Sequence, residues 1–155
     1  MPYPYYPIYL FTRTKHFGDR TVPRELSHIK QQLIQSATEA MDSAYAPYSQ
    51  FKVGAAVLTD TGEIFVGCNV ENASYGLSMC AERNAIANAI IGSGEDTIVI
   101  EAIAVANSQN VACSPCGACR QVIWEFGQNA QVIFRGSQGW QTLTIKDLLP
   151  EGFIL

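Results

Sequence analysis

Apolar residues between Arg24 and Ala44 recur at steps of three and four positions, the spacing that puts side chains on one face of an α-helix. The residues on this face are Leu26, Ile29, Leu33, Ala37, Met41 and Ala44. Pro23 suits the first turn of such a helix, and Pro47 lies just beyond its end. The pattern therefore predicts an amphipathic helix over 24–44 that packs by one face.

Strands and helices alternate in the rest of the chain. A strand over 51–58, a turn at 60–62 and a returning strand over 63–67 predict a hairpin. The other predicted elements are helices over 81–91 and 117–126, strands over 98–106, 131–134 and 141–145, and a last helical turn over 146–149. Because a hairpin is followed by alternating helices and strands, we expect an α/β fold with a mixed sheet covered by helices.

Residues 1–24 differ in composition from the rest of the chain. They hold four of the seven prolines, and they carry four basic residues against one acidic residue, Asp19. Such a segment is typical of a terminal extension that is poorly ordered or packed on the surface. Since about 150 residues make one typical domain, we expect an N-terminal extension over 1–24 and a single domain over 25–155.

The small number of charged residues and the acidic net charge argue against some classes of binding partner. Charged residues make up 15% of the chain and the net charge is −4, whereas proteins that bind nucleic-acid phosphates carry an excess of basic residues. The sequence has no apolar stretch of the roughly 18 residues that a membrane span needs, and its first residues do not resemble a secretory signal. We therefore expect a cytoplasmic protein with a small-molecule ligand, and neither nucleic acid nor membrane as a partner.

Three of the five cysteines lie at the starts of two predicted helices. Cys80 precedes the helix over 81–91, and Cys116 and Cys119 lie at the start of the helix over 117–126. Helix N-termini favour the thiolate form of cysteine, which is the form that binds metals. Three thiolates that leave a fourth position for water are typical of catalytic zinc, whereas structural zinc takes four protein ligands. These residues predict one Zn²⁺ per chain.

Charged residues adjoin these cysteines. Glu82 is the candidate proton carrier, because a carboxylate beside zinc can take a proton from water and return it to a leaving group. Three thiolates give the zinc site a net negative charge, which weakens its ability to acidify water. Arg83 and Arg120 each adjoin a cysteine, and we expect them to offset that charge by donating hydrogen bonds to sulfur.

The sequence pattern by itself also allows other functions for these cysteines. A fourth ligand from Cys113 or Cys68 would make the zinc structural. The spacing of Cys113, Cys116 and Cys119 also resembles the start of an iron–sulfur run, although the further element of that run is missing. Cys116 and Cys119 have the spacing of a redox pair. We expect Cys68 and Cys113 to be buried, unreactive thiols.

A cysteine two positions before a glutamate, followed by Pro-Cys-x-x-Cys, is the signature of zinc-dependent nucleobase deaminases. It stands here as residues 80–82 and 115–119, and the similarity runs from about Ala44 to Phe153. The segments that carry it are 46–49, 51–55, 67–75, 80–83, 114–121 and 147–150. On these segments the chain resembles the cytidine deaminases of the small, homotetrameric, zinc-dependent type.

The resemblance implies a three-layer α/β/α fold with a five-stranded mixed sheet, and it implies a role for each matching residue. The implied metal ligands are Cys80, Cys116 and Cys119, and the implied proton shuttle is Glu82. The implied substrate contacts are Phe51 against the pyrimidine, Asn69 and Glu71 at the ribose hydroxyls, the Ala81 backbone N–H at the base, Ala73 and Tyr75 at a neighbouring subunit's site, and Phe153 over another subunit's pocket. A homotetramer with shared sites is the implied assembly.

The expected function is the zinc-dependent hydrolytic deamination of cytidine and deoxycytidine to uridine and deoxyuridine, with release of ammonia, as in pyrimidine salvage. A deaminase of a modified cytosine nucleoside such as blasticidin S is the alternative on the same zinc core. A nucleic-acid editor conflicts with the acidic charge of the residues after position 24. A non-catalytic structural zinc module would need four protein ligands.

Overall fold

The computed structural model describes residues 24–94 and 97–155 of the chain. Its elements are α1 (Arg24–Met41), β1 (Val53–Thr59), β2 (Ile64–Cys68), the 3₁₀-helix η1 (Tyr75–Leu77), α2 (Ala81–Ser93), β3 (Ile100–Asn107), α3 (Gly117–Phe126), β4 (Gln131–Gly136), β5 (Gly139–Thr144) and α4 (Ile145–Leu148). The extension expected over 1–24 lies outside the described residues, except for Arg24 at the start of α1. Each predicted helix and strand is present, with its ends shifted by at most three residues.

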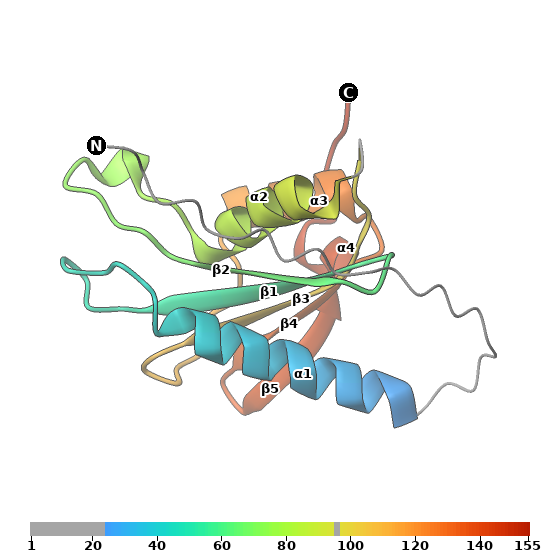
Figure 1. Cartoon of the computed structure of the whole chain (residues 1–155), viewed down its shortest axis with the longest axis horizontal. Coiled ribbons are helices and arrows are strands. Elements are labelled where there is room, and N and C mark those ends of the chain that lie inside the picture. The colour runs from blue at the N-terminus through green and yellow to red at the C-terminus, as the bar shows by residue number, and fades with distance from the viewer. Residues whose placement is uncertain (1–23, 95–96) are drawn as a thin grey trace, which may run out of the picture.

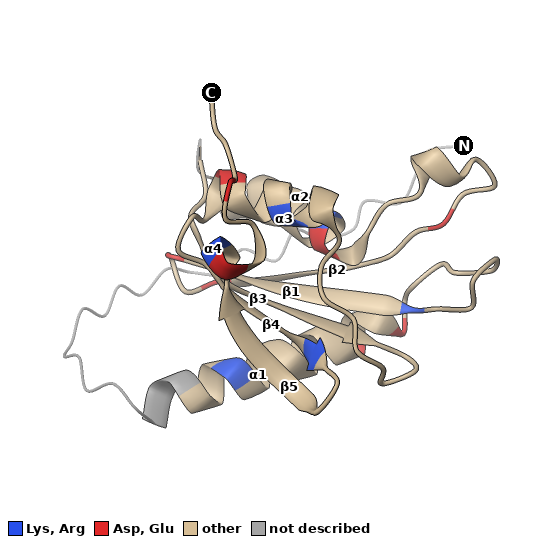
Figure 2. Ribbon diagram, turned by 180° about the vertical axis from the view of Figure 1, so that it is seen from behind, with Lys and Arg blue, Asp and Glu red and all other residues tan. Residues whose placement is uncertain are grey.

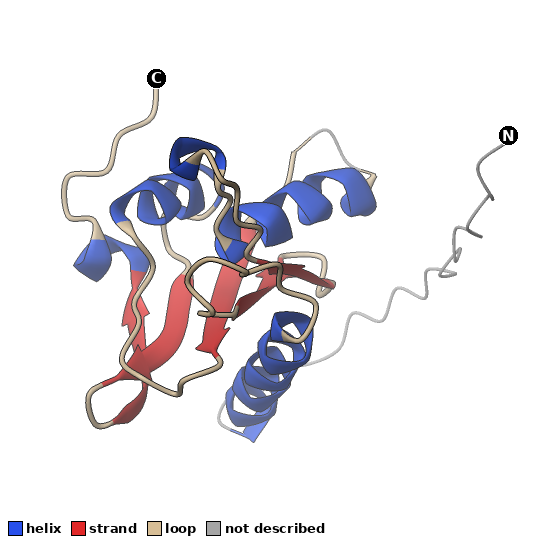
Figure 3. Ribbon diagram, turned by 90° about the vertical axis from the view of Figure 1, so that its left-hand side faces the viewer, coloured by secondary structure: helices blue, strands red, loops and turns tan. Residues whose placement is uncertain are grey.

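Five strands form one mixed sheet in the described part of the chain. Their order is β2-β1-β3-β4-β5, with β3 and β4 parallel and the other neighbours antiparallel. Figure 1 shows α1 on one face of this sheet and α2, α3 and α4 on the other, and the side view in Figure 3 shows the same three layers. The predicted α/β/α fold with a five-stranded mixed sheet is confirmed.

The two faces of the sheet carry separate apolar clusters. In β1, Ala56 and Leu58 pack with α1, whereas Ala55 and Val57 pack on the opposite side, with α2 and α3. Successive strand residues point to opposite faces, so a strand covered on both sides must be apolar throughout. This explains why β1 has a continuous apolar run instead of alternating polar and apolar residues.

The helix layer on the second face places the cysteines. Helices α2 and α3 pack against each other, and their N-cap residues are Cys80 and Cys116. Their N-termini therefore meet beside β3, and with them the segments that the sequence singled out for metal binding.

The described helices include none that is long and apolar enough to cross a membrane.

We predict that Gly54→Ala destabilises the fold by about 3 kcal/mol, near the upper end of the usual cost of overpacking. A Cβ atom at Gly54 would overlap the carbonyl oxygen of Ala37 and the backbone of Met41, so α1 would have to move off β1. Urea denaturation of the variant and the wild type measures the difference in their free energies of unfolding. Gly76→Ala is the matched control, because a Cβ atom there meets nothing within 4 Å. Equal unfolding midpoints for the two variants would show that α1 does not pack on β1 this closely.

Candidate active site

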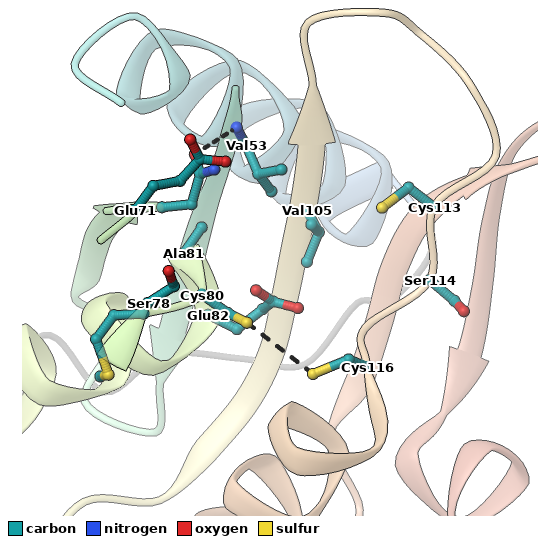
Figure 4. Close-up of a pocket in the computed structure, with 12 residues that line it drawn as sticks. Val53, Glu71, Ser78, Cys80, Ala81, Glu82, Val105, Cys113, Ser114 and Cys116 are labelled. Carbon is teal, nitrogen blue, oxygen red and sulfur yellow. Dashed lines mark hydrogen bonds between the residues drawn. The ribbon is translucent and has the colours of Figure 1, made fainter. Parts of the chain in front are cut away.

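Three thiols converge between the N-termini of α2 and α3. Cys80 and Cys116 are the N-cap residues of these helices, and Cys119 lies in the first turn of α3. The three sulfur atoms all lie within 4.8 Å of one another, and the Sγ atoms of Cys80 and Cys116 are 4.0 Å apart. Figure 4 shows these two side chains pointing toward each other from opposite sides of the site. The cysteines that the sequence predicts as ligands are thus brought together.

One of these sulfurs is held in its ionised form. The pKa of Cys80 is lowered to about 5, first because the Cys119 thiol donates a hydrogen bond to it and then because of the hydrogen bond and positive charge of Arg83. The same hydrogen bond, together with burial, raises the pKa of Cys119. Since metals bind the thiolate, Cys80 is already in the form that a metal ion requires.

The donor set fits zinc. Three sulfurs at about 2.3 Å from one tetrahedral ion would lie roughly 3.8 Å from each other, close to the spacing of these three. Thiolate ligands favour zinc over hard cations such as Mg²⁺. The group offers three protein ligands, and Cys116 is exposed, so the arrangement suits a catalytic ion with one open position and not a closed structural one.

The two arginines behave differently. Arg83 donates from Nη2 to the Sγ of Cys80 at 3.7 Å and to the carbonyl oxygen of Ser78 at 3.2 Å, as its predicted role requires. Arg120 instead donates to the carbonyl oxygens of Pro115 and Leu148 and to the Ser114 hydroxyl. The prediction that Arg120 donates to sulfur is therefore wrong, since each of its three nitrogen atoms donates to an oxygen acceptor instead.

Glu82 is almost fully buried beside the three sulfurs, with 5% of its surface exposed. Burial raises the pKa of its carboxyl, and the negative charge of Cys80 acts in the same direction. A carboxyl with a raised pKa is a stronger base than one in water, and once protonated it keeps its proton up to a higher pH, until it can pass the proton on. Figure 4 shows Glu82 between Cys80 and the loop that carries Cys116.

These groups border a cavity of about 250 Å³. Its lining comprises Val53, Asn69, Glu71, Ser78, Met79, Cys80, Ala81, Glu82, Val105, Cys113, Ser114 and Cys116. Asn69, Glu71, Ala81 and Glu82 were singled out from the sequence, and the structure brings them to the same cavity as the cysteines. Apolar walls with a few convergent polar groups are typical of small-molecule sites.

Asn69 and Glu71 are fixed by the backbone beside them. Asn69 accepts a hydrogen bond from the Val53 amide at 2.8 Å and donates to the Phe51 carbonyl oxygen at 2.9 Å. Glu71 accepts from the Tyr48 amide at 2.8 Å, from the Ser49 amide at 3.2 Å and from the Ser49 hydroxyl. The hydrogen bond from the Ser49 hydroxyl is the main cause that lowers the pKa of Glu71. Both side chains are therefore held in place, and Glu71 is held ionised.

Four of the expected substrate contacts lie outside this cavity lining. Phe51 is half-buried two residues before the start of β1, and Ala73 is exposed in the loop after β2. Tyr75 is 79% exposed on η1, where its ring meets that of Tyr48 with centroids 6.5 Å apart. Phe153 is 65% exposed near the C-terminus. These side chains do not complete the cavity of their own chain.

The prediction that Cys68 and Cys113 are buried is wrong, since both cysteines are partly exposed. Cys113 lines the cavity, because its amide pairs with the Arg135 carbonyl oxygen at 2.8 Å and so fixes the loop beside β4. Burial raises the pKa of its thiol. Ser49, which donates to Glu71, is a functional residue without a role predicted from the sequence, although it lies two positions before Phe51 in a segment that carries the resemblance.

Comparison with known proteins agrees with this geometry. The family model described as the cytidine and deoxycytidylate deaminase zinc-binding region matches residues 27–135. The chain belongs to the cytidine deaminase family. It is 44% identical over 126 residues to the cytidine deaminase of Halalkalibacterium halodurans, a stretch that covers 80% of this chain and 93% of that protein.

Crystal structures of two cytidine deaminases share the fold. The enzyme from Burkholderia pseudomallei superposes with a TM-score of 0.72 at 46% identity, over 79% of this chain and 98% of that one. The enzyme from Mycobacterium tuberculosis superposes with a TM-score of 0.69 at 38% identity, over 81% and 97%. The predicted zinc dependence agrees with the zinc-binding family and with the group of three cysteines.

We predict that Cys116→Ala abolishes stable zinc binding, because two thiolates are left for an ion that needs at least three protein ligands. Metal analysis after dialysis against a mild chelator should find about one zinc per wild-type chain and almost none in the variant. Cys68→Ala is the control, since Cys68 lies in β2 and outside the three-sulfur group. If Cys116→Ala retained zinc and Cys68→Ala lost it, the assignment of Cys116 as a ligand would be wrong.

Proposed function

We propose that this chain catalyses the zinc-dependent hydrolytic deamination of cytidine and deoxycytidine to uridine and deoxyuridine. The observation that carries the proposal is the buried Glu82 carboxyl beside three converging thiols, in a cavity that also holds Asn69 and Glu71. Membership of the deaminase family and the similarity to named cytidine deaminases support the same reaction.

Cys80, Cys116 and Cys119 would hold the zinc ion, which would supply Lewis-acid activation of water when bound. Glu82 accepts one proton from that water and donates a proton to N3 of the cytosine ring while the water oxygen bonds to C4. Glu82 then takes the remaining proton from the hydroxyl group now on C4 and passes it to the exocyclic nitrogen. The bond from C4 to that nitrogen breaks, ammonia leaves, and the C4 oxygen becomes the carbonyl oxygen of the product. One water molecule is consumed for each ammonia released, and Glu82 ends in the protonation state in which it began.

The side chains around the cavity orient the nucleoside. Asn69 and Glu71 offer a donor and acceptors to the ribose hydroxyls. Phe51 is outside the cavity lining but is hydrogen-bonded to Asn69 through its carbonyl oxygen, and it offers an aromatic ring to the pyrimidine. Ala81 is the first residue of α2, so its backbone N–H lies among those without a partner inside the helix and is available to the base. Because Glu71 is already held by Ser49, little ordering is needed when the sugar binds.

A cytoplasmic homotetramer with shared sites accounts for the residues outside the cavity lining. Tyr75 and Phe153 are large side chains that are mostly exposed, and Leu77 beside Tyr75 is 68% exposed. Exposed apolar side chains gathered in one segment mark contact sites. In this assembly Ala73 and Tyr75 reach a neighbour's site, Phe153 covers another subunit's pocket, and residues 25–155 of each chain form one catalytic domain.

We predict that Glu82→Gln keeps its zinc and loses cytidine turnover by about 10³-fold, within the usual range for removal of a general acid–base group. The amide has the size of the carboxyl but cannot carry the proton. The fall in ultraviolet absorbance as cytidine is consumed measures turnover, and metal analysis of the same sample measures zinc. Turnover near the wild-type rate in a zinc-loaded variant would remove Glu82 from the reaction.

We predict that Ser49→Ala raises the KM for cytidine about fivefold, the effect of losing one hydrogen bond worth about 1 kcal/mol. The kcat should change little, because the sugar contact is the same in the ground state and the transition state. Removing the hydroxyl also raises the pKa of Glu71, so the KM should start to rise at a higher pH as the solution is acidified.

Thr61→Ala is the matched control for Ser49→Ala. Its hydroxyl donates to the Glu63 carboxylate at 2.9 Å in the turn between β1 and β2, so the same kind of hydrogen bond is lost outside the cavity lining. An unchanged KM and pH profile in Ser49→Ala would mean that Glu71 does not bind the sugar.

A further inference from the structure

Arg120 contacts two parts of the chain that are far apart in sequence. On one side, Nε donates to the Pro115 carbonyl oxygen at 2.8 Å and Nη2 donates to the Ser114 hydroxyl at 3.0 Å. On the other side, Nη1 donates to the Leu148 carbonyl oxygen at 3.0 Å, at the end of α4. Helix α4 lies beside α3 on the same side of the sheet (Figure 2). One planar group therefore joins the residues just before Cys116 to the end of α4.

The next residues of α3 hold the chain that follows α4. The Nε2 of Gln121 donates to the Phe153 carbonyl oxygen at 2.7 Å. The ring of Trp124 lies so close to Gly152 that a Cβ atom on the glycine would overlap it. Residues 120, 121 and 124 lie on one side of a helix, so α3 presents a continuous surface to residues 148–153, the C-terminal segment.

The other neighbour of Arg120 is the loop over 113–116, the ligand loop. Its first residue is fixed to β4 through the Cys113 amide and the Arg135 carbonyl oxygen. Pro115 is fully buried, so its carbonyl oxygen depends on Arg120 as its partner. Ser114 lines the cavity, and the next residue after Pro115 is the exposed Cys116. The direction in which the loop presents Cys116 thus depends on the guanidinium.

We propose that Arg120 is a positioning residue that joins the ligand loop to the C-terminal segment, so that this segment helps to hold Cys116 as a metal ligand. The role differs from charge compensation at sulfur, which Arg83 performs through its hydrogen bond to Cys80. The inference rests on the proposed function only in taking zinc as the bound metal.

A guanidinium is needed for this link. Its donors point in fixed directions in one plane, whereas the single ammonium of lysine cannot reach acceptors on both sides with the same geometry. Arg120→Lys therefore keeps the positive charge and breaks the link. If Arg120 acted by its charge alone, the lysine variant would behave as the wild type.

The test measures hydrogen exchange and zinc transfer in the full-length, zinc-loaded protein, using Arg120→Lys, Arg120→Met and Gln121→Ala. We expect both Arg120 variants to exchange faster in two places at once. The first place is the Cys113 amide in the ligand loop. The second is the C-terminal segment, where the Leu149 amide donates to the Ile145 carbonyl oxygen and the Gly152 amide donates to the Leu149 carbonyl oxygen. Gln121→Ala should affect only the C-terminal segment.

Zinc transfer to a competing chelator gives a second readout that needs no turnover. We expect transfer to be about tenfold faster in both Arg120 variants, the lower end of the effect of residues that support metal ligands. Lys146→Met is the control, because it removes a positive charge from α4 and breaks only a hydrogen bond to Asn129. It should leave zinc transfer and the exchange of the ligand loop unchanged.

Two outcomes would overturn the proposal. If Arg120→Lys had the wild-type rates of hydrogen exchange and zinc transfer, the positive charge alone would suffice. If the ligand loop exchanged faster while the C-terminal segment kept its wild-type rate, the two segments would not be joined. If Arg120→Met does not fold, Arg120→Lys still decides between them. A wild-type protein that holds zinc but leaves cytidine unchanged would contradict the proposed function and not this link.

Discussion

Negative charge gathered in one partly buried place is the constraint on which the site depends. Glu82 and Cys119 are buried beside Cys80 and the exposed Cys116, and unpaired charges held close together and away from water are costly. The fold supplies partial positive charge from the N-termini of α2 and α3 and a full charge from Arg83. A zinc ion supplies the rest. The raised pKa of Glu82 has the same origin, since burial is its main cause and the negative charge of Cys80 adds to it.

This arrangement requires the two helices to begin side by side, and the sheet ensures that they do. Helix α2 follows the hairpin of β1 and β2, whereas α3 follows β3, which pairs with β1. The two faces of β1 must both be covered, and α2 and α3 share the face opposite α1. The close approach that β1 makes to α1 at Gly54 is part of the same packing. The core therefore fixes the distance between Cys80 and the ligand loop.

Much of this was predictable from sequence because the signals are local. Apolar spacing located the helices and strands, and two cysteine segments before helical patterns indicated the metal ligands and Glu82. Resemblance gave the order of layers. The partners of Arg120 were not predictable, since one of them is the Leu148 carbonyl oxygen and a backbone acceptor leaves no trace in the sequence. For the same reason adjacency to Cys119 suggested a bond to sulfur that the folded chain does not make. The partial exposure of Cys113 depends on how β4 holds its loop, which the pattern of residue types does not encode.

The N-cap positions of the helices show what the metal site costs. Thr144 and Asp147 form a complete capping box on the short helix α4. Cys80 and Cys116 occupy the same position on α2 and α3 and make no side-chain hydrogen bond to the helix backbone. Serine or aspartate there would stabilise each helix by about 1 kcal/mol and would remove a sulfur ligand. Selection for a more stable chain and selection for a working one thus oppose each other at positions 80 and 116, where a stabilising substitution is also an inactivating one.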